Sequence, residues 1–83
     1  MRNGRVTMLR TDVNGETRNW TLRSEYRQSA IRMVLGGDPW KSATIYDGVN
    51  RVVGRLVKRR VGRHVWIDYY RGSDTVPAWS KRV

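Results

Sequence analysis

The stretch from Ala43 to Arg71 constrains most strongly what this chain can fold into. It holds two β-branched apolar runs on either side of a long basic run, and turn residues separate the runs at Asp47-Gly48 and at Gly62. Short runs rich in Val, Ile and Tyr that are bounded by turn residues are typical of strands joined by hairpins. The stretch is therefore predicted to form a three-stranded antiparallel meander with the basic run as its middle strand.

A further hairpin and a helix precede this meander. Asn14-Gly15 lies between two apolar runs and is a strong hairpin signal, because a type I′ turn needs positive φ at both central residues. Ser24 is a typical helix N-cap, and Gly36-Gly37 followed by Pro39 ends the helical pattern. Trp40 is predicted to anchor the linker that follows. The predicted strands are residues 5–13, 17–23, 42–46, 51–60 and 64–71, and the predicted helix is residues 25–35.

These elements define a small α+β fold in the order β-β-α-β-β-β. The sheet is predicted to be mostly antiparallel, and the helix is expected to pack on it because so short a helix is not stable alone in water. The chain of 83 residues is expected to form a single domain, residues 1–83. The segments 1–4 and 75–83 show no regular pattern and are predicted to be flexible ends.

The pattern leaves three details of the sheet open. A two-residue loop at Asn14-Gly15 would place Leu9 opposite Trp20, whereas a bulged loop would bring Val6 and Met8 into the core. Gly54, in the middle of the basic strand, indicates either a β-bulge or the close approach of another part of the chain. Which face of the sheet meets the helix is the third open detail.

The net charge of +10 favours anionic partners, among which nucleic acid is the commonest and acidic protein surfaces come next. No acidic residue lies between Asp47 and Asp68, so the positive charge peaks along the basic strand. Lys and Arg at alternate positions of an exposed strand can follow a phosphate backbone, and a two-stranded ribbon can enter a major groove. The simpler alternative is a solvated face that keeps a small protein soluble.

The last predicted strand adds aromatic residues to this surface. Trp66 and Tyr70 share one side, while Val65, Ile67 and Tyr69 share the other. Aromatic rings beside cations form stacking platforms for single-stranded nucleic acid. The alternative is a sheet covered on both faces, with Trp66 in the core. The predicted nucleic-acid-binding residues are Arg51, Arg55, Lys58, Arg59, Arg60, Arg63, Trp66 and Tyr70.

Composition argues against several classes of protein. The chain has no cysteine and one histidine, so a disulfide framework is excluded and neither a metal site nor a cofactor is expected. No nucleophile, base and orienting group stand at a diagnostic spacing, so catalysis is not expected. No apolar run approaches the ~20 residues of a membrane span, and no signal-peptide pattern is present. A cytoplasmic protein is therefore predicted.

The segment TIYDGVNRVVGRLVKRR, followed by VWIDYY, resembles hairpins in small uncharacterised proteins of GC-rich actinobacteria and their phages. The resemblance covers residues 44–70 and implies neither an activity nor functional residues. It makes a phage accessory protein one option for this chain.

The sequence supports two main hypotheses about function. The first is a basic accessory protein that binds nucleic acid, DNA rather than RNA, mainly through phosphates. The second is a protein-interaction module that docks on an acidic host or partner protein, and the resemblance implies a phage-encoded module as one form of it. A structural subunit that pairs through an exposed strand edge is a weaker third hypothesis, and the oligomeric state stays open.

Overall fold

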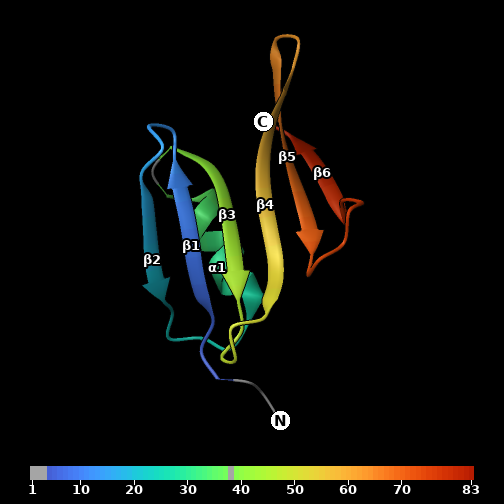
Figure 1. Cartoon of the computed structure of the whole chain (residues 1–83). Helices are drawn as coiled ribbons and strands as arrows, with labels where there is room; N and C mark the ends of the chain where they lie inside the picture. The colour runs from blue at the N-terminus through green and yellow to red at the C-terminus, as the bar shows by residue number, and fades with distance from the viewer. Residues whose placement is uncertain (1–3, 38) are drawn as a thin grey trace.

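The computed structural model describes residues 4–37 and 39–83, and in this part of the chain a single helix lies against one face of a six-stranded sheet (Figure 1). All neighbouring strands are antiparallel, and their order across the sheet is β2-β1-β3-β4-β5-β6. The α+β class and the predicted order of elements are confirmed, with one more strand at the C-terminal end. The elements are β1 (Thr7–Asp12), β2 (Thr17–Thr21), α1 (Arg27–Leu35), β3 (Trp40–Tyr46), β4 (Val52–Val61), β5 (His64–Arg71) and β6 (Trp79–Arg82).

The core lies between α1 and the face of the sheet that we call the helix side. Ala30, Ile31 and Val34 of α1 are buried there, and the helix packs against β1, β3 and β4. The helix spans only nine residues and lies behind the sheet in Figure 1. The opposite face, which we call the open side, has no helix over it. The buried residues that the sheet contributes to the core are Met8, Ala43, Ile45, Leu56, Ile67 and Tyr69.

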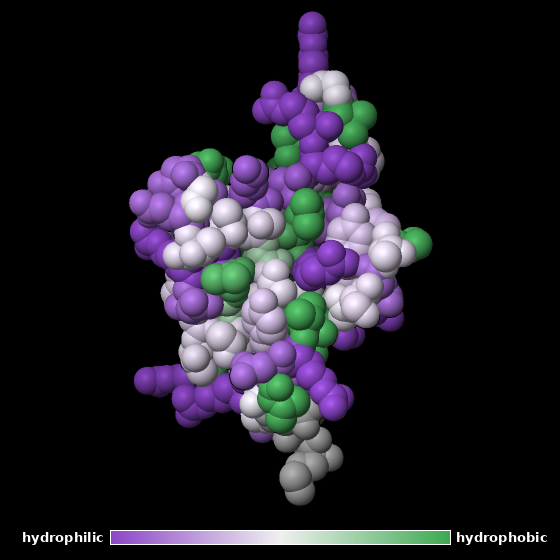
Figure 2. All heavy atoms as spheres, viewed as in Figure 1, coloured by the Kyte–Doolittle hydropathy of each residue, from purple (hydrophilic) through white to green (hydrophobic). Residues whose placement is uncertain are grey.

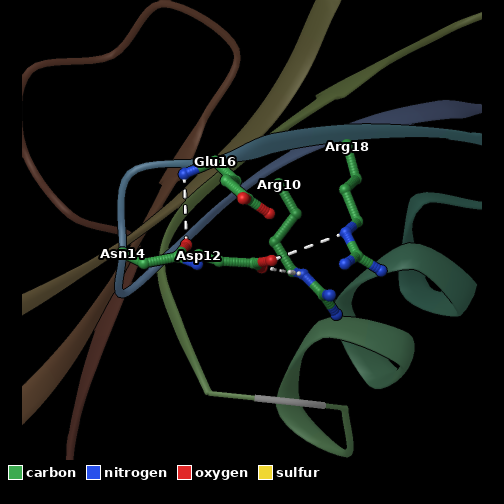
Figure 3. Close-up of polar contacts among 5 residues, drawn as sticks. All are labelled: Arg10, Asp12, Asn14, Glu16 and Arg18. Atoms are coloured by element: carbon green, nitrogen blue, oxygen red, sulfur yellow. Dashed lines mark hydrogen bonds and ion pairs between the residues drawn. The ribbon is translucent and has the colours of Figure 1, made fainter.

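The first hairpin adopts the bulged register. Met8 lies opposite Trp20, and both Val6 and Met8 are buried, as the bulged alternative predicts. The amide N–H of Gly15 donates to the carbonyl of Asp12, and Gly15 has a φ of +89°. Asn14 keeps a negative φ, so the turn is not of type I′ and the two-residue alternative does not apply. The Asn14 side chain instead accepts a hydrogen bond from the Glu16 N–H, which stabilises a three-residue loop (Figure 3).

The helix begins two residues later than predicted, at Arg27. Ser24 does not cap it, because its hydroxyl oxygen accepts the N–H of Tyr26, at 3.1 Å, and the hydroxyl of Ser29, at 2.9 Å. Serine thus forms a local turn here in competition with the first turn of the helix. The helix ends as predicted, and the N–H of Gly36 donates to the carbonyl of Arg32.

Two segments expected to be irregular belong to strands. Trp40 is not in a linker but begins β3, and the neighbouring Asp38 lies outside the described residues. In the segment 75–83, residues Trp79–Arg82 form β6 along the outer edge of β5, so the prediction of an irregular tail is wrong for them. The ring of Trp79 stacks on Tyr69 with 5.5 Å between the centroids. This contact joins residues on two different strands, so no local pattern in the sequence predicts it. Residues 1–3 of the other predicted flexible end also lie outside the described residues.

Gly54 marks both a bulge and a close approach. The pairing of β3 with β4 shifts register where Ile45 faces Gly54 and Tyr46 faces Val52, which leaves Val53 as the extra residue of the bulge. The ring of Tyr69 lies directly against Gly54, since a Cβ placed on Gly54 would be 2.9 Å from its Cε1 and 3.0 Å from its hydroxyl oxygen. A glycine is therefore required for Tyr69 to enter the core.

A methyl group at position 54 should accordingly destabilise the fold. We expect Gly54→Ala to lower the free energy of unfolding by about 1–3 kcal/mol, because the Tyr69 ring is buried and cannot move aside freely. Urea unfolding followed by tryptophan fluorescence measures the change. Gly36→Ala is the matched control, because its Cβ would meet the Arg32 carbonyl at 3.4 Å, and it should stay within about 0.5 kcal/mol of wild type. Equal effects of the two exchanges would contradict this account of Gly54.

Candidate nucleic-acid interface

Strands β4 and β5 extend beyond the rest of the sheet as a two-stranded ribbon (Figure 1). The pairing of β4 with β3 ends where Val57 faces Ser42, whereas its pairing with β5 continues until Val61 faces His64. The pairing of β6 with β5 begins only at Trp66. Among the described residues, Lys58 to Val61 of β4 therefore have β5 as their only neighbouring strand. His64 and Val65 of β5 lie beyond its pairing with β6, and one hydrogen bond from the Val83 N–H to the Val65 carbonyl, at 2.9 Å, links them to the C-terminal end. We call residues 58–65 the projecting ribbon.

The projecting ribbon carries four cations and no acid, namely Lys58, Arg59, Arg60 and Arg63. Because Leu56 is buried on the helix side, strand alternation places Lys58 and Arg60 on that side and Arg59 on the open side. Arg63 lies in the turn, where the φ of +60° at Gly62 suits a type II′ hairpin. Cations thus face outward on both sides of the ribbon and at its tip. Figure 2 shows that hydrophilic residues cover most of this end of the molecule.

The open side brings two arginines and two aromatic rings of the predicted set together. The guanidinium carbon of Arg55 lies 4.7 Å from the centroid of the Tyr70 ring, and that of Arg59 lies 5.9 Å from the Trp66 ring. Both rings are half-buried. They lie on the other face of β5 from the buried Ile67 and Tyr69, as the alternation of the strand predicts. Trp66 is therefore not in the core. Each ring is covered by a guanidinium, so a base approaching this face meets the arginine before the ring.

The carboxylate of Asp68 neutralises Arg59. Asp68 is only 3% exposed, and its two oxygens accept hydrogen bonds from the Arg59 Nε at 2.8 Å and Nη2 at 3.2 Å. The Ser80 hydroxyl donates a third bond at 2.6 Å. The bonds from Arg59 and Ser80 lower the pKa of Asp68, although burial alone would raise it. The bond to Asp68 likewise raises the pKa of Arg59. Arg59 therefore offers less charge to an outside ligand than its place in the sequence suggests.

Two further predicted residues lie apart from the projecting ribbon. Arg51 precedes β4 at its far end, roughly 33 Å from Val61 at the rise of ~3.3 Å per strand residue. Its backbone N–H donates to the Asp47 carboxylate in the turn. Arg55 lies within the sheet, and its Nη2 donates to the carbonyl of Asp74. The eight predicted residues thus form a projecting group and a separate group in the sheet, rather than one continuous surface.

Two arginines of the first hairpin are paired with Asp12, and one of them is buried. Arg10 is 4% exposed and lies on the helix side, with its guanidinium 4.6 Å from the Trp20 ring. Its Nε donates to the Asp12 carboxylate at 2.8 Å, and the Arg18 Nε lies 3.6 Å from the other Asp12 oxygen (Figure 3). Sequence reasoning missed this buried charge, because Arg10 occupies a core position of an otherwise apolar strand face. The single charge of Asp12 offsets one of the two positive charges.

Two searches of residues 4–37 and 39–83 gave negative results. Within these ranges no three His, Cys, Asp or Glu side chains gather closely enough to hold a metal ion. No helix in the same ranges is long and apolar enough to cross a membrane.

Comparisons of this chain with protein-family models, with curated proteins and with solved structures found no match. Function is therefore inferred from the residues and geometry described above.

The pKa of Asp68 leads to a prediction about stability and pH. A carboxylate whose pKa is lowered by folding stabilises the protein above its unfolded pKa, and this stability is lost as the pH falls through the folded pKa. We expect Asp68→Asn to lower the free energy of unfolding at pH 7 by about 1–3 kcal/mol, because buried bonds to Arg59 and Ser80 are weakened. The difference from wild type should narrow as the pH falls below the unfolded pKa of about 3.9 and through the lower folded pKa, because wild-type Asp68 then also becomes neutral.

Urea unfolding at several pH values measures both effects. Asp74→Asn is the matched control, because it removes the same charge from an exposed side chain, and it should stay close to wild type throughout. A loss for Asp68→Asn that is the same at pH 7 and pH 2 would show that the stabilisation does not come from the ionised carboxylate.

Proposed function

We propose that this chain is a small accessory protein that binds DNA, mainly through phosphate contacts and without catalysis. The observation that carries the proposal is the projecting ribbon, a hairpin end beyond the pairing with β3 that carries four cations and no acid. Three of these cations, Lys58, Arg60 and Arg63, have no acidic partner among the described residues. Such a hairpin can contact a ligand on both of its faces and at its tip. The same cations on one face of a covered sheet could contact a ligand on that face alone.

The dimensions of the ribbon favour double-stranded DNA as the ligand. The major groove of B-DNA is ~12 Å wide and admits a two-stranded ribbon, whose strands are ~4.8 Å apart. In that position Lys58 and Arg60 face one wall of the groove, and Arg63 at the tip reaches inward. The major groove of A-form RNA is deep and narrow and excludes side chains. The shape of the ribbon thus supports DNA over RNA.

Binding in this mode is electrostatic and weakly sequence-specific. Contacts from Lys and Arg to phosphates position a protein but carry no direct sequence information. The two Arg-covered rings on the open side, at Tyr70 and Trp66, add planar surfaces against which an unpaired base can stack. The cytoplasm is the compartment that this proposed role implies.

Reversing charge on the projecting ribbon should weaken DNA binding selectively. We expect Arg60→Glu combined with Arg63→Glu to reduce affinity for a ~30 base-pair duplex at least roughly tenfold at ~50 mM salt, because about two phosphate contacts are lost. The slope of log affinity against log salt should fall by about 2 for the same reason. Fluorescence anisotropy between ~50 and ~200 mM salt measures both quantities.

The matched control is Arg23→Glu combined with Arg27→Glu. Both residues are exposed and lie where β2 leads into α1, at the end of the molecule away from the ribbon (Figure 1). Each double exchange lowers the net charge from +10 to +6, since every Arg→Glu removes two charges. Equal losses for the two variants would mean that only overall charge matters. Absence of duplex binding by the wild type at the lowest salt would overturn the proposal and favour an acidic protein as the partner of the ribbon.

A further inference from the structure

A groove lies on the helix side at the base of the projecting ribbon. Its volume is about 370 Å³, within the range of ~300–1,000 Å³ that is usual for small-ligand sites. It is formed where the end of β1, the start of β3 and the first ribbon residues meet. Its walls include Val13, Trp40, Lys41, Lys58, Arg60 and Val65.

A β-bulge directs Trp40 to this groove. Between β1 and β3, Thr11 faces Ser42 but Asp12 faces Trp40, which leaves Lys41 as the extra residue. Regular alternation from the buried Ala43 would place Trp40 on the open side. The extra residue returns Trp40 to the helix side, where it is 3% exposed, and leaves Lys41 exposed beside it. The bulge thus places an indole and an ammonium group at the same site.

The groove is lined by positive charges that mostly have no acidic partner among the described residues. Four cations line it, namely Lys41, Lys58, Arg59 and Arg60. Arg59 is paired with Asp68, whereas none of the other three takes part in an ion pair among the described residues. The Nζ of Lys58 lies 4.6 Å from the centroid of the Trp40 ring. No acidic residue is found among the described residues that line the groove. Its chemistry therefore combines these three cations with an apolar wall.

We infer that this groove binds a single nucleotide, with the phosphate held by Lys41, Lys58 and Arg60. A terminal phosphate carries a charge of about −1.5 to −2 at pH 7, which matches three cations that line one groove better than the single charge of a carboxylate does. The base packs against Val13 and Val65, which supply the apolar wall. The nucleotide is either free or the unpaired end of a DNA strand.

The second form of the ligand rests on the proposed function and deepens it. The projecting ribbon holds the duplex backbone, and the groove at its base takes an unpaired terminal nucleotide that carries a 5′-phosphate. The protein then prefers a duplex with such an end over a blunt duplex of the same length. Lys41, which lies in the groove but outside the ribbon, contributes to this preference and not to general affinity for the duplex.

The free nucleotide provides a test that does not depend on duplex binding. We expect titration with dAMP, followed by ¹H–¹⁵N NMR, to shift the Trp40 indole N–H and the Lys41 amide in a saturable way. Lys41→Glu should abolish saturation, whereas Lys81→Glu should retain it, because Lys81 is exposed on β6 outside the groove and the charge change is the same. Deoxyadenosine, which lacks the phosphate, should cause no saturable shift.

The outcomes separate this inference from the proposed function. Shifts spread over the basic surface without saturation, or identical shifts from dAMP and inorganic phosphate, would overturn the nucleotide site even if the duplex binds. The strand-end form is supported if the wild type binds the duplex with a 5′-phosphorylated overhang at least about threefold more tightly than the blunt duplex. Lys41→Glu should lose this preference, and Lys81→Glu should keep it. Equal affinity for both duplexes, with saturable dAMP binding, rules out the strand-end form and leaves the free nucleotide as the ligand.

Discussion

The packing of Tyr69 against Gly54 joins the two halves of this protein. Helix α1 is ~10 Å wide, whereas six strands at ~4.8 Å spacing span roughly 24 Å, so the helix reaches β1, β3 and β4 but not β5 or β6. Tyr69 carries the core across to β5 by lying over the bare backbone of Gly54, and Trp79 then stacks on its outer side. The C-terminal strands and the projecting ribbon depend on this contact for their position.

The fold neutralises some of its cations and leaves others free. Arg10 and Arg18 share Asp12, and Arg59 is paired with Asp68. Arg10, Asp12 and Asp68 are shielded from water, and pairing is needed there because an unpaired buried charge is costly. Beyond the end of β3 no such need exists, and Lys58, Arg60 and Arg63 extend without acidic partners among the described residues. The distribution of ion pairs thus concentrates the available positive charge at the projecting end.

The two proposed binding surfaces lie next to each other and share residues. Lys58 and Arg60 belong both to the ribbon and to the groove at its base, and Lys41 is the groove cation that lies outside the ribbon. The groove exists because a bulge in β3 turns Trp40 toward the helix side. A ligand that contacts both surfaces would need a phosphate backbone for the ribbon and an unpaired nucleotide for the groove. The end of a DNA duplex has both.

Local sequence patterns determined most of the strands, the helix and the concentration of cations in β4. These features follow from alternation, turn residues and charge, which act over a few neighbouring residues. Only the tertiary structure decided that Arg59 is neutralised by Asp68, that Trp79–Arg82 pair with β5, and that Trp40 and Lys41 line a groove. Each depends on contacts between residues on different strands or on a bulge in the register. The alternation of apolar and polar residues along a strand does not encode which strand pairs with its edge or where a bulge occurs. The sequence alone therefore could not predict these features.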